Sequence, residues 1–535
     1  MASAHTNTTC QHRVNMKDLG KSQKDYAVYL PAISSFYTKQ LDKIVNKVPN
    51  ESRTPAGFEL GNEGLDFLKN KDSYYHYPFG LYSAGHAHLN IEKSHEDEPM
   101  IQDRDREVTT LLGDSGGFQI ATGVLKLDWA NAKDQNDPAR LAICEKILRW
   151  LEHTADWSMT LDIPAFAAVE PLSKKTGLTS FQDTLDISLL NLHYFLENRV
   201  PGKTKFLNVL SGTDDATSKA WYEAVKCFSQ PSFVTEVYGD ANRTLEGYAF
   251  AGINMKDLTC VLNRLLDLRE DGLLEGKDWI HFLGTGKLQW ACYLTAIQRL
   301  LRQYDNPNIT LSFDAASPFV NTAYGQTYAH NFFEPGKFGY FMDRAFDQQA
   351  LVGSTLPAPF GHSPVMSRLT MGDLCTMGPG DKDKNGNLKF AEGQPLVDKH
   401  GEPKLDDKGN QLYAERDSTT WDTQTYLYYM GHSVFNHIDA VQEANRLADV
   451  ESFRDSVHYT NWIKPKKKSS KAQEISPYVP VNIYYFTSLV KEVLDPQCVN
   501  PRRIIADNKE LLDHLSMGGD ADDTVKEEAL SLFNF

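Results

Sequence analysis

Long apolar runs are missing from this sequence, and cysteines are few. No window approaches the length of a transmembrane helix, so we expect no membrane span. The opening stretch MASAHTNTTCQHRVNMKD has no apolar h-region, and we expect no secretory signal. The seven cysteines are scattered without a CxxC or CxC pair, which disfavours zinc knuckles and indicates free thiols in a reducing compartment. We therefore expect a cytoplasmic protein.

Basic residues are also fewer than acidic ones, with 55 Lys and Arg against 71 Asp and Glu. The net charge is −16, which argues against a protein that coats nucleic acid without sequence preference. It leaves room for an enzyme with a local basic groove, and two short basic patches exist, at 464–471 (KPKKKSSK) and at Arg502–Arg503. The first is a candidate nucleic-acid contact, although a run of charge is more often a solvated face.

The chain of 535 residues can bury a large core, and its central part repeats one unit. A short apolar strand is followed by a small or acidic residue and then by an amphipathic helix, which predicts βαβ crossovers and a parallel sheet. An open doubly wound sheet is the main competitor, but no GxGxxG follows the first strand. We therefore predict an α/β fold, a (β/α)₈ TIM barrel. Its expected strands are 77–83, 108–114, 157–162, 205–211, 247–253, 279–284 and 309–314, with 338–343 as the eighth.

The region after the barrel changes in composition. Gly, Asp, Lys and Asn become frequent, and repeated turn motifs of the Asn-Gly kind predict hairpins. One stretch, 381–392, matches the calcium-loop pattern, but no helix is predicted on either side, so we favour a solvated hairpin over a calcium site. The predicted parts are a disordered N-terminus (1–20), the barrel (21–375), a hairpin-rich insertion (376–416), a C-terminal helix packed on the barrel (417–450) and a mixed helical extension that is a candidate nucleic-acid contact (451–535).

A TIM barrel carries its functional side chains at the carboxyl ends of its strands. Three of the expected strands end in aspartate: Asp114, within LLGDSGGFQIATG, Asp162 and Asp314. Three carboxylates at one mouth fit a retaining displacement at a sugar, with one acid as nucleophile and another as proton shuttle. They equally fit Mg²⁺ binding for phosphoryl or enolase-type chemistry. The residues alone leave these alternatives open.

The segment LLGDSGGFQI resembles the DSGG(F/Y)Q signature of the tRNA-guanine transglycosylases, (β/α)₈ barrels that exchange guanine for a 7-deazaguanine. Other segments resemble that family in the same order. SMTLDIPAF is similar to its base-reading segment, GYAFAGI to its glycine segment, HFLGTGK to LMGVGKP, and SFDAASP to the FDCVLPT segment that carries the nucleophile. With GHSVFNHIDAVQEA, which resembles the family's C-terminal helix, the similarity covers roughly residues 75–450.

The resemblance implies a role for each matching residue. Asp314 would be the nucleophile that attacks C1′, and Asp114 the acid/base that handles the proton of the base. Asp162 would read the guanine edge, and Gly252 would offer backbone groups to the incoming base. The floor of the site would be shaped by Ser115, Gly116 and Gly117.

Three departures from the family pattern alter what the resemblance implies. Leu210 stands where the family has a base-contacting glutamine, and Ser211 and Gly212 follow it as the remaining contacts of that segment. The family's zinc motif, CxCxxC with a later histidine, is missing, because only Cys375 and Cys498 follow the FDxxxP segment. The arginine of the family's PTR sequence is missing as well. This combination resembles the phage and bacterial relatives that insert 7-deazaguanines into DNA.

We therefore expect a pentosyltransferase that replaces guanine in DNA with a preQ0-like 7-deazaguanine, taken up as the free base, through a covalent aspartyl intermediate. No cofactor or metal is expected, and a phage-encoded protein would act in the host cytoplasm. The alternatives are a tRNA-guanine transglycosylase, a non-catalytic nucleic-acid-binding barrel subunit, and an unrelated metal-dependent barrel enzyme. Aromatic candidates for stacking on bases, several of which we expect in the core instead, are Phe118, Phe166, Tyr248 and Phe319.

Overall fold

The computed structural model describes residues 25–47, 54–129, 131–334, 337–376, 420–449 and 481–517, together with residues 405 and 409. Three predicted features lie outside the described residues: the disordered N-terminus at 1–20, almost all of the 376–416 insertion with its calcium-loop pattern at 381–392, and the basic patch at 464–471.

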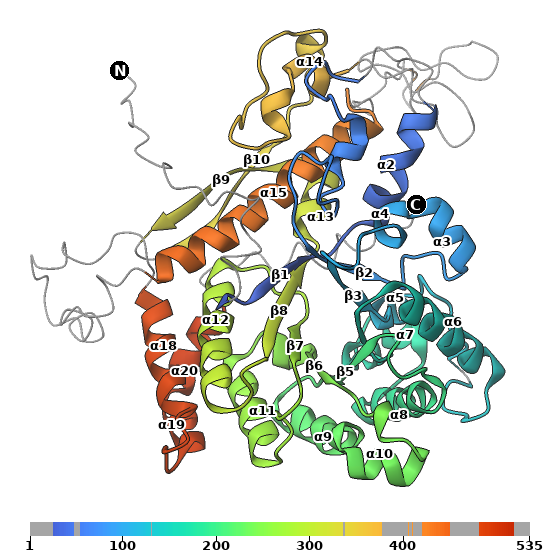
Figure 1. Cartoon of the computed structure of the whole chain (residues 1–535), viewed down its shortest axis with the longest axis vertical. Coiled ribbons are helices and arrows are strands. Elements are labelled where there is room, and N and C mark those ends of the chain that lie inside the picture. The colour runs from blue at the N-terminus through green and yellow to red at the C-terminus, as the bar shows by residue number, and fades with distance from the viewer. Residues whose placement is uncertain are drawn as a thin grey trace, which may run out of the picture.

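Eight parallel strands form a nearly closed barrel with helices around it, which confirms the predicted TIM-barrel-like α/β fold (Figure 1). The strands are hydrogen-bonded in the order β1-β8-β7-β6-β5-β4-β3-β2. Between β1 and β2 the seam is bridged where Ala32 pairs with Leu81 and the Ile33 N–H donates to the Leu81 carbonyl at 2.9 Å. The strands are β1 (Val28–Pro31), β2 (Phe79–Ser83), β3 (Thr110–Asp114), β4 (Trp157–Met159), β5 (Lys205–Leu210), β6 (Gly247–Phe250), β7 (Trp279–Phe282) and β8 (Thr310–Ala315).

The prediction that residues 338–343 form the eighth barrel strand is wrong. Residues 338–343 lie in β10 (Lys337–Arg344), which pairs antiparallel with β9 (Gln326–Glu334) in a separate hairpin. The eighth barrel strand is instead β1, which pairs with β8. Its four residues end in proline and give a weak strand signal, whereas Pro335–Gly336 between two aromatic-rich runs is a hairpin signal that favours β9–β10 over a barrel strand.

Helices connect successive strands and pack against the outer face of the barrel. Helix α6 begins as its sequence predicts, with Pro138 at its first position and the Asp137 side chain accepting N–H groups of the first turn. The described helices are α2 (Ser35–Lys47), α3 (Ile91–Asp97), α4 (Pro99–Gln102), α5 (Gly117–Thr122), α6 (Pro138–Thr154), α7 (Ser173–Thr176), α8 (Phe181–Asn198), α9 (Asp215–Val225), α10 (Pro231–Tyr238), α11 (Leu258–Glu270), α12 (Leu288–Tyr304), α13 (Ser317–Ala323), α14 (Met371–Leu374), α15 (Thr423–Ala448), α18 (Val481–Val493), α19 (Pro501–Asp507) and α20 (Lys509–Met517).

Strand residues alternate between two apolar cores, as the period of two requires. The outer core lies between the strands and the surrounding helices and is the larger. The inner core fills the barrel and is made of alternate apolar side chains of β1 to β7. Its buried members are Val28, Leu30, Leu81, Leu112, Trp157, Met159, Leu207, Val209, Ala249, Ala251 and Trp279.

The long helix α15 crosses the barrel wall near β8 and contacts α12, α13 and β9 (Figure 1). Its His437 ring stacks on Tyr29 of β1 with the ring centroids 4.3 Å apart, and the Tyr29 hydroxyl donates to the Ala315 carbonyl of β8 at 3.2 Å. Burial lowers the pKa of His437 to about 3, so the ring is neutral at physiological pH. The first described strand and the longest described helix therefore meet behind β8.

The described part of the C-terminal extension, α18–α20, packs against α11 and α12. Arg502 contacts the carboxylates of Asp267 and Glu270 at 2.9 and 2.7 Å, and Arg503 contacts Asp507 at 3.5 Å. The basic patch at Arg502–Arg503 is thus engaged in ion pairs within the chain. Among the described residues, no helix combines the length and apolar character needed to cross a membrane.

Candidate active site

The three predicted aspartates lie at the carboxyl ends of their strands. Asp114 is the last residue of β3, Asp314 is the last but one of β8, and Asp162 follows β4 after three residues. Asp114 lies two residues after the inward-facing Leu112, so it points to the inside of the barrel. Burial is the main cause that raises the pKa values of Asp114 and Asp162, and a neighbouring charge adds to each increase: that of Asp314 for Asp114, and that of Asp114 for Asp162. The structure thus brings the three carboxyl groups into one electrostatically coupled set.

Asp314 is held by one of its two carboxylate oxygens. Its Oδ1 accepts the backbone N–H of Gly284 at 2.7 Å, and Nε2 of His281 lies 3.2 Å from the same atom without the alignment of a good hydrogen bond. No hydrogen bond in the described part of the chain uses Oδ2. The side chain is 13% exposed. One oxygen is therefore fixed, and the other remains available to a ligand.

Asp114 is the carboxyl group best placed to carry a proton. Burial raises its pKa most strongly, and the charge of Asp314 adds to the increase. Hydrogen bonds from Ser83 and from the Gly116 N–H, at 3.3 Å, oppose the shift, as does the nearby imidazole of His86. A raised pKa favours the protonated form of a carboxyl group, and such a group can donate a proton in one step and accept it in the next.

Asp162 has the clearest shift of the set. Burial raises its pKa to about 7, followed by the charge of Asp114. It lies against the loop that follows β3, where a Cβ on Gly117 would be 2.3 Å from the Asp162 carbonyl oxygen and 3.4 Å from its Oδ1. The Ser115 hydroxyl donates at 3.2 Å to the carbonyl of Thr160, which lies in the segment after β4 that also carries Asp162. The DSGG segment is therefore attached directly to the strand end that carries Asp162.

The backbone conformation and the close surroundings of Gly116 both favour glycine at this position. Its φ is +85°, a left-handed conformation that side-chain-bearing residues rarely adopt, and a Cβ there would lie 2.8 Å from the Gly85 backbone nitrogen. This close approach joins the loop after β3 to the loop after β2. The predicted floor residues are thus contacts between loops at the mouth.

The other three predicted residues form a second group, after β5 and β6. A Cβ on Gly252 would lie 2.2 Å from the Gly212 carbonyl oxygen and 3.1 Å from the Ser211 hydroxyl. The Ile253 N–H donates to the Gly212 carbonyl at 2.9 Å. These residues lie at the same end of the barrel as the aspartates, but no hydrogen bond of the described chain joins the two groups.

Leu210 has a different position from the one that the resemblance implied. Its side chain packs in the outer core and is 1% exposed. Val209 faces the inside of the barrel, so the alternation along β5 assigns Ser211 to the inner face. Ser211 is therefore the residue of this segment that lies beside Gly252, and Leu210 has no part in the mouth.

The aromatic candidates fall into two kinds. Tyr248 and Phe319 are buried in the outer core. Phe118 and Phe166 follow β3 and β4, with ring centroids 5.6 Å apart at an interplanar angle of 56°, and Phe166 is 37% exposed. Only the second pair has a surface that a base could stack on.

Two residues near Asp314 were missed in the sequence: His281 and Ser312. Both side chains are fully buried, and the alternation along their strands turns them into the barrel. A usable signal exists for His281, because WIHFLG places it between the inward-facing Trp279 and Leu283, where a polar side chain is unusual.

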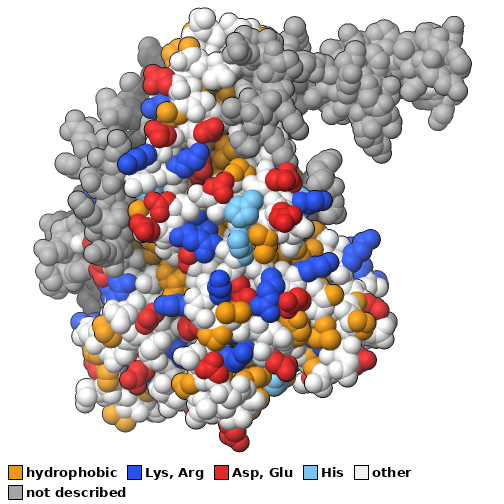
Figure 2. Space-filling model, turned by 45° about the vertical axis from the view of Figure 1, so that its right-hand side comes forward, with side chains coloured by type: hydrophobic (Ala, Val, Ile, Leu, Met, Phe, Trp, Pro, Cys, Tyr) orange, Lys and Arg blue, Asp and Glu red, His pale blue; other side chains and the backbone are white. Residues whose placement is uncertain are grey.

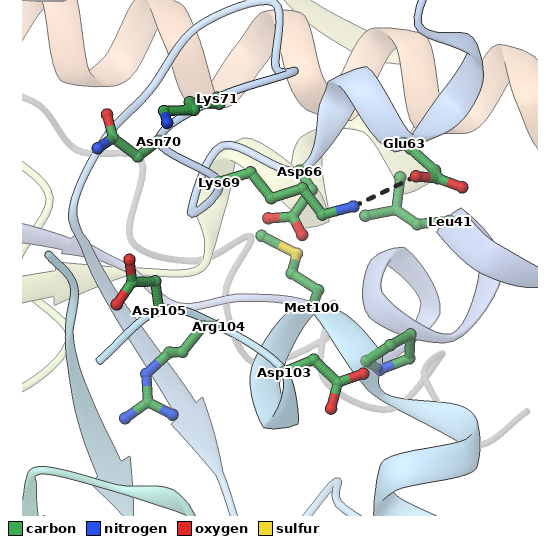
Figure 3. A pocket seen from close by; sticks show the side chains of 11 residues that line it. Leu41, Glu63, Asp66, Lys69, Asn70, Lys71, Met100, Asp103, Arg104 and Asp105 are labelled. Carbon is green, nitrogen blue, oxygen red and sulfur yellow. Dashed lines mark hydrogen bonds and ion pairs between the residues drawn. The ribbon is translucent and has the colours of Figure 1, made fainter. Parts of the chain in front are cut away.

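A second candidate is a pocket of about 470 Å³ beside the segments that lead into the amino ends of β2 and β3 (Figure 3). It is lined by α2, α4 and the segments that lead into β2 and β3, and it contains the buried Asp66 and the Lys69–Glu63 ion pair at 3.4 Å. In TIM barrels the amino-terminal end of the strands serves stability, whereas catalytic groups lie at the carboxyl end. We therefore assign the candidate site to the aspartates rather than to this pocket.

The fold and site define a TIM-barrel-like protein with a coupled set of acidic side chains at the carboxyl end of its strands. No protein-family model matches the sequence, and neither does any curated protein. Within the described residues, no group of three or more His, Cys, Asp or Glu side chains is arranged to hold a metal ion.

Proposed function

We propose that this protein is a base-exchange glycosyltransferase that replaces guanine in a nucleic acid with a free 7-deazaguanine. The observation that carries the proposal is that the three aspartates differ in their hydrogen bonding and in their pKa values. Asp314 presents one free carboxylate oxygen, while the pKa values of Asp114 and Asp162 are raised, which favours their neutral forms. A nucleophile, a proton carrier and a group that can pair with a purine edge are the parts that such an exchange needs.

The exchange proceeds in two displacements at C1′ of the nucleotide. Oδ2 of Asp314 forms a bond to C1′ as the C1′–N9 bond breaks, and guanine leaves with that electron pair and a proton from Asp114. N9 of the incoming base then attacks C1′ and gives its proton to Asp114, while the C1′–Oδ2 electron pair returns to Asp314. Configuration at C1′ is retained after two inversions, and no other reactant is consumed.

DNA is the proposed polymer. The sequence lacks the zinc motif and the PTR arginine that the resemblance associates with tRNA binding. On the face shown in Figure 2, acidic and basic side chains of the described residues are interspersed, so this face offers local contacts rather than a broad basic field. The target guanine has to leave the base stack to reach carboxylates inside a barrel mouth.

Transfer of labelled base tests the proposal. The full chain is incubated with radiolabelled guanine or preQ0, together with either duplex and single-stranded DNA or bulk tRNA. We expect label in DNA and none in tRNA. Label in tRNA alone would replace DNA by tRNA as the substrate, and binding of nucleic acid without label in either would favour a non-catalytic subunit. Loss of transfer in the presence of a chelator would favour a metal-dependent enzyme.

A further inference from the structure

The buried inner core of the barrel is apolar, but two fully buried polar side chains lie directly beneath Asp314. There, His281 of β7 and Ser312 of β8 face each other as a polar pair, and both are 0% exposed. Their neighbours on the inner face are the aliphatic and aromatic side chains of the inner core. Because a buried polar group costs stability unless it is hydrogen-bonded, such a pair in an apolar interior needs an explanation.

The pair belongs to a line of polar atoms that ends at the carboxylate. The indole Nε1 of Trp279 donates to the Ser312 hydroxyl oxygen at 2.7 Å, and that oxygen lies 2.9 Å from Nδ1 of His281. Nε2 of His281 then faces Oδ1 of Asp314 at 3.2 Å and has no aligned hydrogen-bond partner among the described residues. The line runs from Trp279, the first residue of β7, to Asp314 near the carboxyl end of β8.

The groups at the two ends of the line, an indole donor and a carboxylate acceptor, together favour one arrangement of the protons. An indole N–H can only donate, so Ser312 accepts from Trp279 and has its own proton free to donate to Nδ1 of His281. The neutral ring then carries its proton on Nε2, which faces the carboxylate. The opposite tautomer would place a ring lone pair against a carboxylate oxygen, and this contact is repulsive.

We propose that His281 is a positioning residue for Asp314, an inference that rests on the proposed function. Its Nε2 lies 3.2 Å from Oδ1, the same atom that accepts the Gly284 N–H at 2.7 Å, so both contacts fall on one oxygen and leave Oδ2 as the atom that bonds to C1′. The same contacts stabilise the negative charge that returns to Asp314 when the C1′–Oδ2 bond breaks. His281 touches neither the base nor the sugar, so it acts on the rate of both displacements rather than on binding.

Nuclear magnetic resonance of the free protein tests the line of protons without any substrate. The full chain is labelled with [¹⁵N]histidine, and the His281 signals are assigned by their absence in His281→Gln. We expect a proton on Nε2, facing Asp314. A ring protonated on Nδ1 alone would overturn the proposal.

Two variants test the effect on exchange. His281→Leu removes the polar N–H group that faces Oδ1, and we expect kcat to fall about 10- to 100-fold with KM for nucleic acid unchanged, since a donor beside a charged group contributes more than one beside a neutral group. His281→Gln restores an N–H near the Nε2 position, and we expect it to recover most of that loss. Equal losses in both variants, or a change confined to KM, would overturn the positioning role.

The two proposals can fail separately. If the His281 ring is protonated on Nε2 but the protein transfers no label, the proposed function is overturned. The arrangement of protons from Trp279 through Ser312 to His281 then still holds. Label transfer by a protein whose ring is protonated on Nδ1 alone would support the function and overturn the role of His281. The resonance measurement uses the wild-type chain, so it also decides the case in which His281→Leu does not fold.

Discussion

A methyl group on Gly117 would lie 2.3 Å from the carbonyl oxygen of Asp162, closer than real Cβ contacts come. Gly117→Ala therefore has to push the loop after β4 away from the loop after β3. We expect a loss of about 1–3 kcal/mol in the free energy of unfolding, the usual cost of overpacking. Urea denaturation measures it, with Gly361→Ala as the matched control, because nothing lies within 4 Å of a Cβ at that position.

If the two loops form the base site, Gly117→Ala also lowers label transfer more than its stability loss explains. A folded Gly117→Ala variant that transfers label at the wild-type rate would contradict the placement of Asp162 in the site.

The raised pKa of Asp162 makes a prediction about pH. Because this pKa is about 7 in the folded chain against an ordinary 3.8, the folded state holds an extra proton between these values. The free energy of unfolding should therefore fall as pH rises from about 4 to 7. Asp162→Asn should remove part of that fall, on the order of 2 kcal/mol between pH 5 and pH 8.

Urea denaturation at several pH values measures this difference. Glu275→Gln, at an exposed position, is the control and should follow the wild type. Burial also raises the pKa of Asp66 to about 7, so a second fall of the same sign should persist in Asp162→Asn. Parallel curves for wild type and Asp162→Asn would contradict the shift.

The two reacting carboxylates should be separable by mutation. Asp314→Asn removes the proposed nucleophile, and we expect no label transfer and no enzyme–DNA adduct that survives denaturation. Asp114→Asn removes the proposed proton carrier, and we expect kcat to fall about 10²- to 10⁴-fold with DNA affinity nearly unchanged. An adduct formed by Asp314→Asn in a denaturing gel would show that Asp314 has another role.

The exposed ring of Phe166 should contribute to nucleic-acid binding. Stacking of a base on an aromatic side chain contributes about 1–3 kcal/mol, so Phe166→Ala should weaken DNA binding about 5- to 100-fold, as measured by fluorescence anisotropy. Val200→Ala is the control, because Val200 is exposed just before β5, at the opposite end of the barrel. Equal affinities of both variants would exclude Phe166 from the interface.

Arg502 should act on stability rather than on DNA affinity. Its ion pairs with Asp267 and Glu270 attach α19 to α11. Arg502→Ala should lower the free energy of unfolding by about 1 kcal/mol and leave the salt dependence of DNA binding unchanged. A phosphate contact would instead reduce the slope of log K against log salt by about 1. Arg503→Ala, at a more exposed position, should change neither quantity.

The sequence predicted the barrel because its strands carry strong local signals. Seven apolar runs with small or acidic ends alternate with amphipathic helices, and a parallel sheet then brings the strand ends together. Asp114 and Asp314 could be predicted for the mouth for this reason. The strand β1 could not, because its four residues gain their stability from pairing with β8, a contact about 280 residues away along the chain.

The surroundings of the aspartates were less accessible to prediction. The pairing of His281 with Ser312 depends on the register of β7 against β8, which places His281 beside Ser312. A motif gives the type of residue at a strand end, but it does not tell whether the neighbouring side chains point into the barrel or out of it. Leu210 illustrates this, since its place in a motif suggested the mouth while the strand period turns it outward.

The meeting of Tyr29 and His437 behind β8 has a consequence for synthesis on the ribosome. The strand that carries Asp314 is flanked by β1, and Tyr29 of β1 stacks on His437 of α15, so the packing around β1 is incomplete until the chain has been made past Ala448. A nascent chain that already contains all eight barrel strands still lacks the helix on which Tyr29 stacks.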